Sequence, residues 1–210
     1  MHIKKALFIW LTFTFIGFLN ALSAGGDAAK GKTAYAVCIA CHGANGEGNK
    51  ALNSPAIAGL ADWYLERQLK NYKKGVRGAH PKDTFGMQMA PMAKTLTTDQ
   101  AIKDVSAYVA SLKPNKPAIT IKGNAEAGKA SYAICTACHG ANGEGNKALN
   151  SPALTNQHDW YLVRQIKNFK DGVRGAHAKD VFGMQMAPMA KTLVTDDMIN
   201  NVVAYISTLK

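Results

Sequence analysis

Two five-residue segments of the chain combine thiol and imidazole groups at a spacing that can hold a cofactor. They read Cys38-Ile39-Ala40-Cys41-His42 and Cys135-Thr136-Ala137-Cys138-His139, and they contain all four cysteines of the 210-residue chain. Cysteines at i and i+3 lie on one side of a helical turn, so both can form thioethers with the two vinyl groups on one edge of a porphyrin. The histidine at i+4 then points over the ring, where its Nε2 can bind the iron. The C-x-x-C-H pattern therefore predicts covalent attachment of c-type haem.

The same residues allow three other interpretations. Two short-range disulfides could form in an exported chain, a C-x-x-C pair could exchange thiols, and two cysteines with a histidine could bind zinc. A thioredoxin-like thiol site requires a β-α-β context, which this sequence lacks. Two C-x-x-C-H motifs in one helical chain favour two covalently bound c-type haems.

The two motifs belong to a tandem duplication. Position i corresponds to position i+97 without insertion or deletion from Gly31 to Lys113, and 59 of these 83 pairs are identical. The segment Lys113-Pro114-Asn115-Lys116-Pro117 separates the copies, and its prolines stop a helix. We therefore expect two similar domains, residues 25–115 and 116–210.

The first 24 residues have the pattern of a secretory signal peptide. Lys4 and Lys5 precede an apolar stretch, residues 6–22, that ends in small residues. We expect cleavage after Ser23 or Ala24, with an uncleaved anchor as the alternative. The protein is therefore expected to be exported to the periplasm.

Composition excludes several classes of protein. Hydrophobic residues make up 47% of the chain and charged residues 19%, which excludes wholesale disorder. The formal net charge of the whole chain is +11, of which Lys4 and Lys5 contribute +2 and the two copies share the rest. Neither copy has the basic stripe and interleaved aromatic residues of a nucleic-acid-binding protein, so no nucleic acid partner is expected. A moderately basic surface suits acidic protein partners or peripheral association with an anionic membrane, and equally a solvated face without a partner.

Each copy has the pattern of helices joined by loops. Helix caps are expected at Asp27, Asp62 and Thr98, and at the matching Asp159 and Thr195 of the second copy. Apolar residues recur at helical spacing after these caps, and no convincing two-residue alternation indicates a strand. The sequence predicts an all-α fold with a thin core, which a cofactor would complete.

A Met-rich segment could supply a second ligand to each iron. Residues 85–92, Phe-Gly-Met-Gln-Met-Ala-Pro-Met, recur as residues 182–189 and are expected to form a loop. Methionine ligation raises the reduction potential of a haem and suits an electron carrier, whereas an open site suits ligand binding or catalysis. Spacing alone does not rank the three methionines of each segment.

The chain resembles the dihaem class I cytochromes c of the cytochrome c4 type. The resemblance covers nearly all of the mature sequence and rests on the two C-x-x-C-H motifs, Asn53-Ser54-Pro55-Ala56, Trp63-Tyr64-Leu65 with Gln68, the Met-rich segment and Ala107-Tyr108. It implies two tandem cytochrome c domains, each with a covalently attached haem, and the pairing of the two haem edges across the domain interface.

The resemblance also implies the iron ligands. In that family the axial methionine lies a few residues before the leucine that precedes the last helix. Placing Leu96 and Leu193 on that leucine assigns the axial ligands His42, Met89, His139 and Met186. The alternatives, in order, are Met92 with Met189, Met87 with Met184, and bis-histidine ligation through His80 and His177.

Further residues receive candidate roles. The resemblance assigns the carbonyls of Pro55 and Pro152 as acceptors for the ring N–H of the ligating histidines. Trp63 and Trp160 could either hydrogen-bond a haem propionate or simply pack in the core. Arg77 and Arg174 could either contact a propionate or lie on the surface. His158, which replaces Ala61 of the first copy, is expected at the domain interface.

The implied function is electron transfer without catalysis. The resemblance suggests a carrier from a quinol–cytochrome c reductase or a dehydrogenase to a haem-copper terminal oxidase, so its partners would be donor and acceptor redox proteins of a respiratory chain. One alternative is a dedicated dihaem subunit of a dehydrogenase, such as a sulfide-oxidising flavocytochrome. Another is an enzyme with an open iron, such as a dihaem peroxidase.

Overall fold

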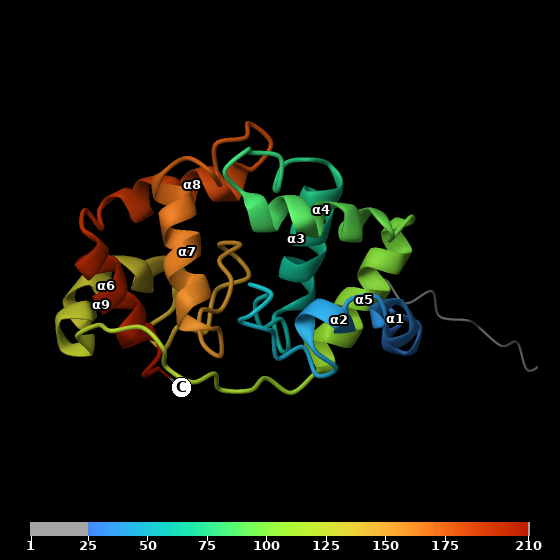
Figure 1. Ribbon diagram of the computed structural model, residues 1–210, viewed down its shortest axis with the longest axis horizontal. Coiled ribbons are helices and arrows are strands. Elements are labelled where there is room, and N and C mark those ends of the chain that lie inside the picture. The colour runs from blue at the N-terminus through green and yellow to red at the C-terminus, as the bar shows by residue number, and fades with distance from the viewer. Residues whose placement is uncertain (1–24, 210) are drawn as a thin grey trace, which may run out of the picture.

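The computed structural model describes residues 25–209, so the expected signal peptide, residues 1–24, lies outside the described part. Two helical domains lie side by side, joined by an extended stretch that runs along one edge of both (Figure 1). The first domain consists of α1 (Ala28–Tyr35), α2 (Ile39–His42), α3 (Asp62–Lys73), α4 (Thr84–Lys94) and α5 (Asp99–Ser111). The second domain consists of α6 (Ala125–His139), α7 (Asp159–Lys170), α8 (Val181–Lys191) and α9 (Asp196–Ile206).

The predicted all-α fold is confirmed, since residues 25–209 contain no β-strand beyond two isolated bridges. In this range no helix combines the length and apolar character needed to cross a membrane.

In each domain the first helix packs against the last: α1 against α5, and α6 against α9. Glycine permits this close crossing, because a Cβ on Gly31 would overlap the backbone carbonyl of Asp104, and one on Gly128 that of Asn201. The remaining helices complete each domain, with α3 against α4 and α5, and α7 against α8 and α9. One helix of each crossed pair leads directly into a C-x-x-C-H motif: α1 ends just before Cys38, and α6 ends in His139.

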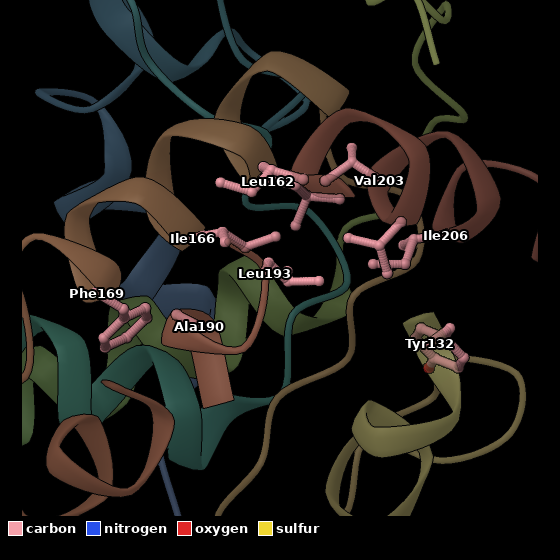
Figure 2. Packing of buried hydrophobic residues seen from close by; sticks show 10 residues of the cluster. Tyr132, Leu162, Ile166, Phe169, Ala190, Leu193, Val203 and Ile206 are labelled. Atoms are coloured by element: carbon pink, nitrogen blue, oxygen red, sulfur yellow. The ribbon is translucent and has the colours of Figure 1, made fainter. Parts of the chain in front are cut away.

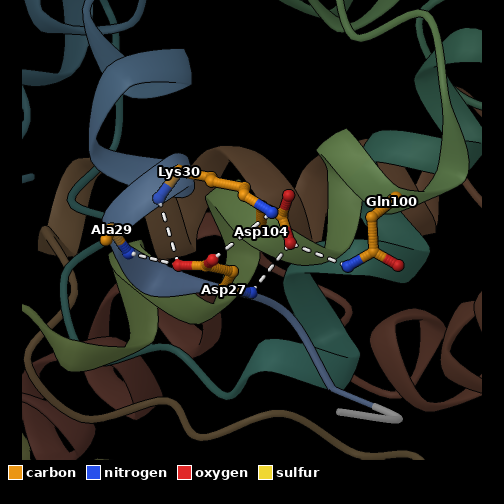
Figure 3. Close-up of polar contacts among 5 residues, drawn as sticks. All are labelled: Asp27, Ala29, Lys30, Gln100 and Asp104. Atoms are coloured by element: carbon orange, nitrogen blue, oxygen red, sulfur yellow. Dashed lines mark hydrogen bonds and ion pairs between the residues drawn. The ribbon is translucent and has the colours of Figure 1, made fainter. Parts of the chain in front are cut away.

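Polar contacts at the start of α1 fix this crossing (Figure 3). The carboxylate of Asp27 accepts from the N–H groups of Ala29 and Lys30, which makes it the expected N-cap. The N–H of Asp27 donates to Asp104 of α5 at 2.7 Å, and Gln100 donates to the same carboxylate oxygen. The start of α1 is therefore tied to α5 by hydrogen bonds.

The apolar core of each domain is small and faces inward between the helices. In the second domain it contains Tyr132, Leu162, Ile166, Phe169, Ala190, Leu193, Ile199, Val202, Val203 and Ile206 (Figure 2). Side chains from α6, α7, α8 and α9 meet here, and in α7 and α9 they recur at the helical spacing that the sequence predicts.

Two sequence-based expectations are wrong in detail. Asp62 and Asp159 do not cap their helices but are their first residues, after Ala61 and His158. The carboxylate of Asp159 instead accepts from the N–H and hydroxyl of Thr120 and the N–H of Ile121, which fastens the inter-domain stretch to α7.

The Met-rich segments are helical and do not form the loops that were expected. They make up most of α4 and α8, each capped by an aspartate, Asp83 and Asp180, that accepts from a glycine N–H. Met, Gln, Ala and Lys are good helix formers, and this propensity outweighs the single hydrogen bond that each internal proline removes.

Candidate functional site

A single cavity of about 580 Å³ extends through both domains and contains the chemistry predicted from the motifs. Its walls are largely apolar and come from helices of both domains together with the loops that follow the two motifs. The structure brings together on these walls the sequence-predicted residues Cys38, Cys41, His42, Met89, Cys135, Cys138, His139 and Met186.

The motif histidines are buried and held in one tautomer. His42 and His139 are each 8% exposed, and their Nδ1 atoms lie 2.9 Å and 2.8 Å from the carbonyl oxygens of Pro55 and Pro152. A carbonyl can only accept, so Nδ1 carries the proton and Nε2 keeps its lone pair. Burial lowers the pKa of both histidines, which keeps the rings neutral. This is the state that an iron ligand requires.

The loop after each motif positions the proline carbonyl. In the first domain Gly48 N–H donates to the His42 carbonyl at 2.8 Å, and a short bridge pairs Asn49 with Ser54. Asn53 completes the turn with a φ of 55°, in the left-handed region that asparagine tolerates. The second domain repeats the arrangement, with Asn150 at a φ of 56°.

The cysteine environment is unlike that of a thiol-exchange site. Burial, with a smaller contribution from the neighbouring motif cysteine, raises the pKa of the Cys38 and Cys135 thiols to about 11. A thiol-exchange centre has a cysteine with a lowered pKa, because the thiolate is the reacting form. The geometry instead places both thiols of each motif on the cavity wall.

Position relative to the cavity separates the methionines that could be the second iron ligand from those that could not. Met89 and Met186 are half-buried on its wall, and Met92 and Met189 also line it but are 38% and 39% exposed. Met87 and Met184 are exposed and lie off the lining, and so do His80 and His177. Each of these two histidines accepts a backbone N–H through Nδ1, from Lys82 and Lys179.

Two arginines of the cavity wall, the buried Arg77 and the half-buried Arg174, cross between the domains. Arg77 donates to Gln68 of its own domain and to Tyr161 and Gln165 of the other, at 2.8, 2.9 and 3.1 Å. Arg174 makes the reciprocal contacts with Gln165, Gln68 and Tyr64.

The Nε–H groups of Arg77 and Arg174 are buried without a partner among residues 25–209, and both arginines line the cavity. A buried guanidinium N–H left unpaired costs stability unless an acceptor meets it. A haem propionate is such an acceptor, so these residues fit the predicted cofactor.

Sequence reasoning missed two half-buried arginines of the cavity wall that join the domains, Arg67 and Arg164. They stack over Phe182 and Phe85 of the opposite domain at 4.7 and 4.4 Å. Their recurrence in both copies is a signal of shared structure, but it does not separate an interface from a core.

The tryptophans and His158 also lie around this contact. Trp63 and Trp160 are off the cavity lining, with Arg67 and Arg164 over their rings. The indole Nε1 of Trp160 is buried without a partner among residues 25–209, so packing alone does not account for this side chain. His158 bonds to Glu47 of the other domain, as expected of an interface residue.

The chain is similar to known cytochromes c along both of its domains. Residues 28–113 and residues 125–210 each match the cytochrome c family. Cytochrome c4 of Azotobacter vinelandii is 34% identical over 194 residues, which cover 87% of this chain and 90% of that protein. The thiosulfate dehydrogenase electron acceptor of Thiomonas intermedia is 38% identical over 150 residues, covering 66% of this chain and 65% of that protein.

The fold of a solved structure agrees as well. The crystal structure of reduced recombinant cytochrome c4 from Pseudomonas stutzeri superposes with a TM-score of 0.70 at 30% identity, covering 88% of this chain and all of that one. The four cysteines of the two motifs fit two covalent c-type haems. The chain belongs to the cytochrome c family and, within it, to the dihaem electron carriers of the cytochrome c4 type.

Proposed function

We propose that the chain relays single electrons between redox proteins of the periplasm, with His42 and Met89 as axial ligands in the first domain and His139 and Met186 in the second. The observation that carries this proposal is the continuous cavity, which both motifs and both Met-rich helices line. Bound haem supplies reversible one-electron chemistry at its iron. The protein's own part is to hold one imidazole and one thioether in each domain, to exclude water, and to keep the two sites adjoining.

Adjacent sites explain how the duplication serves a relay. An electron from a donor enters at one domain, crosses between the domains, and leaves at the other toward an acceptor. No covalent bond is made or broken in this transfer. The arginine contacts between the domains support this, because they fix the separation over which the electron crosses. We assign a quinol–cytochrome c reductase or a dehydrogenase as donor and a terminal oxidase as acceptor.

The proposal extends to processing and domain limits. Residues 1–24 act as a cleaved export signal, and the mature chain divides into residues 25–115 and 116–210. Mass spectrometry of the protein isolated from the periplasm tests the first point. A mature N-terminus at residue 24 or 25 agrees with cleavage, and an intact N-terminus contradicts it.

Optical spectra of the mature protein test the electron-carrier role. Low-spin haems at two per chain, with a ferric methionine charge-transfer band and no response to carbon monoxide, are expected of a saturated Met/His carrier. A high-spin component, or carbon monoxide binding at either haem, indicates an open iron and favours an enzyme.

One observation favours a second candidate function, the electron-accepting subunit of a dehydrogenase. The Thiomonas intermedia relative bears the name of a thiosulfate dehydrogenase electron acceptor. Stopped-flow reduction of this protein by a thiosulfate dehydrogenase and by a quinol–cytochrome c reductase, together with co-purification, distinguishes the two. Fast reduction by the reductase supports the first candidate. Fast reduction by the dehydrogenase alone, in a complex that survives purification, supports the second, and the same reduction without a stable complex supports the first.

A further inference from the structure

The peptide group between Pro55 and Ala56 is hydrogen-bonded on both of its sides. Its carbonyl, from Pro55, accepts from Nδ1 of His42 at 2.9 Å. Its N–H, from Ala56, donates to Oε1 of Gln157 at 3.2 Å, and Gln157 Nε2 donates in return to the Ala56 carbonyl at 2.8 Å. A residue of the second domain thus contacts the peptide that holds the motif histidine of the first.

His158 reinforces the same cross-domain contact. Its Nε2 lies 2.9 Å from the Glu47 carbonyl, which can only accept, so this nitrogen carries a proton. The ring stacks on Trp160 at 5.2 Å between centroids, which fixes its direction. Gln157 and His158 together hold the loop that follows the first motif by three hydrogen bonds.

The second domain receives no such support from the first. The positions that match Gln157 and His158 in the first copy are Leu60 and Ala61, whose side chains have no polar atoms. The Pro152–Ala153 peptide therefore accepts from His139 without a glutamine on its N–H side. This is a chemical difference between two otherwise closely matched sites.

We propose that Gln157 is a positioning residue that lowers the reduction potential of the first haem relative to the second. Hydrogen bonds in series polarise one another, so donation from Ala56 N–H to Gln157 makes the Pro55 oxygen a stronger acceptor. A stronger acceptor draws the Nδ1 proton and makes His42 a more electron-rich ligand, which favours ferric iron. The inference rests on the proposed axial role of His42.

The internal repeat supplies the test variants. Gln157→Leu and His158→Ala install the residues of the first copy, and Asn156→Gly is the control, because Asn156 is exposed and shares a positive φ with its counterpart Gly59. The potentials of both haems are measured by redox titration followed by NMR, each haem being assigned through its own pair of cysteines.

Gln157→Leu is expected to raise the potential of the first haem only. At a fixed applied potential the ferrous-to-ferric ratio of this haem should rise about twofold, because each hydrogen bond in a series strengthens its neighbour by a fraction of that neighbour's free energy. His158→Ala should give a smaller change in the same direction, and Asn156→Gly none. An unmoved first haem, or an equal shift of both, overturns the proposal.

A measurement on the unmodified protein covers the case in which Gln157→Leu fails to fold. The amide proton of Ala56 should exchange with solvent more slowly than that of Ala153 in the same sample, because only the first has the glutamine acceptor. Equal exchange overturns the proposal. If unmodified protein does not show the low-spin Met/His spectrum, the proposed function is contradicted instead. The two failures are therefore distinguishable.

Discussion

Arg67 of the first domain donates two hydrogen bonds to Asn150 of the second, at 3.0 Å to Oδ1 and 2.8 Å to the backbone oxygen. Arg164 makes the same pair of bonds to Asn53, at 2.9 and 2.8 Å. Both asparagines belong to the loops that present the proline carbonyls to the motif histidines. The domain interface and the two histidine sites are therefore mechanically joined.

Replacing Arg67 or Arg164 with alanine should loosen the domain interface. Each variant loses two charge-assisted hydrogen bonds and a cation–π contact, so we expect a loss of about 2–3 kcal/mol in the free energy of unfolding. The radius of gyration from small-angle X-ray scattering should increase. The two variants should behave alike, because their contacts are reciprocal.

Two further variants test whether the shape of the guanidinium group is what holds the interface. Arg67→Lys should rescue little, since an ammonium lacks the planar fork that meets both Asn150 oxygens. Lys30→Ala, whose side chain is solvent-exposed and far from the interface in sequence, is the control and should leave scattering unchanged. Full rescue by lysine would contradict the geometric explanation.

Replacing Met89 with alanine should open the iron of the first domain. Carbon monoxide should then bind one haem per chain, and the methionine charge-transfer band should fall by half. Met186→Ala should do the same for the second domain. Met92→Ala is the matched control and should leave the charge-transfer band at full intensity. A halved band in Met92→Ala and an unchanged band in Met89→Ala would move the ligand assignment to Met92.

Asp159 should make stability depend on acid pH. Burial opposes its ionisation, but hydrogen bonds from Thr120, Ile121 and Trp160 outweigh burial and lower its pKa below the ordinary value of 3.8. A lowered folded pKa means that the ionised carboxylate stabilises the fold above about pH 4, and this contribution disappears as the pH falls through the folded value.

Asp159→Asn should cost about 2 kcal/mol at neutral pH and flatten the acid limb of the stability curve, measured by denaturant unfolding between pH 2 and 7. Asp62→Asn is the matched control, because Asp62 is exposed in the first domain. An equal effect of both substitutions would contradict the role assigned to the inter-domain stretch.

Arg77 should influence both stability and potential. Arg77→Met leaves Tyr161 without its arginine donor and Gln165 with Arg174 alone. It should destabilise the protein by about 2–3 kcal/mol. It also removes a buried positive charge beside the cavity, which should lower the reduction potential. Arg77→Lys keeps the charge and should lower the potential less, as redox titration would show. A larger drop with lysine would rule out the charge as the cause.

The sequence could predict the centre of each site and much less of its surroundings. The motif fixes Cys38, Cys41 and His42 through local helical geometry, so short-range spacing was sufficient. The contacts of Gln157 and Arg164 join residues more than 100 positions apart, and no local pattern encodes them. The helical form of residues 84–94 was not predicted, although the segment begins after a capping residue, Asp83, and is rich in helix-forming residues that outweigh its proline and glycine.

The attachment of residues 120 and 121 to Asp159 shortens the free tether between the two domains to the stretch that begins after α5. A short tether confines its two ends to a small volume, at an effective concentration that is on the order of millimolar for flexible links. An interface held at that concentration stays closed even if its intrinsic affinity is weak. At protein concentrations well below millimolar, each domain therefore pairs with its own partner in preference to a domain of another molecule.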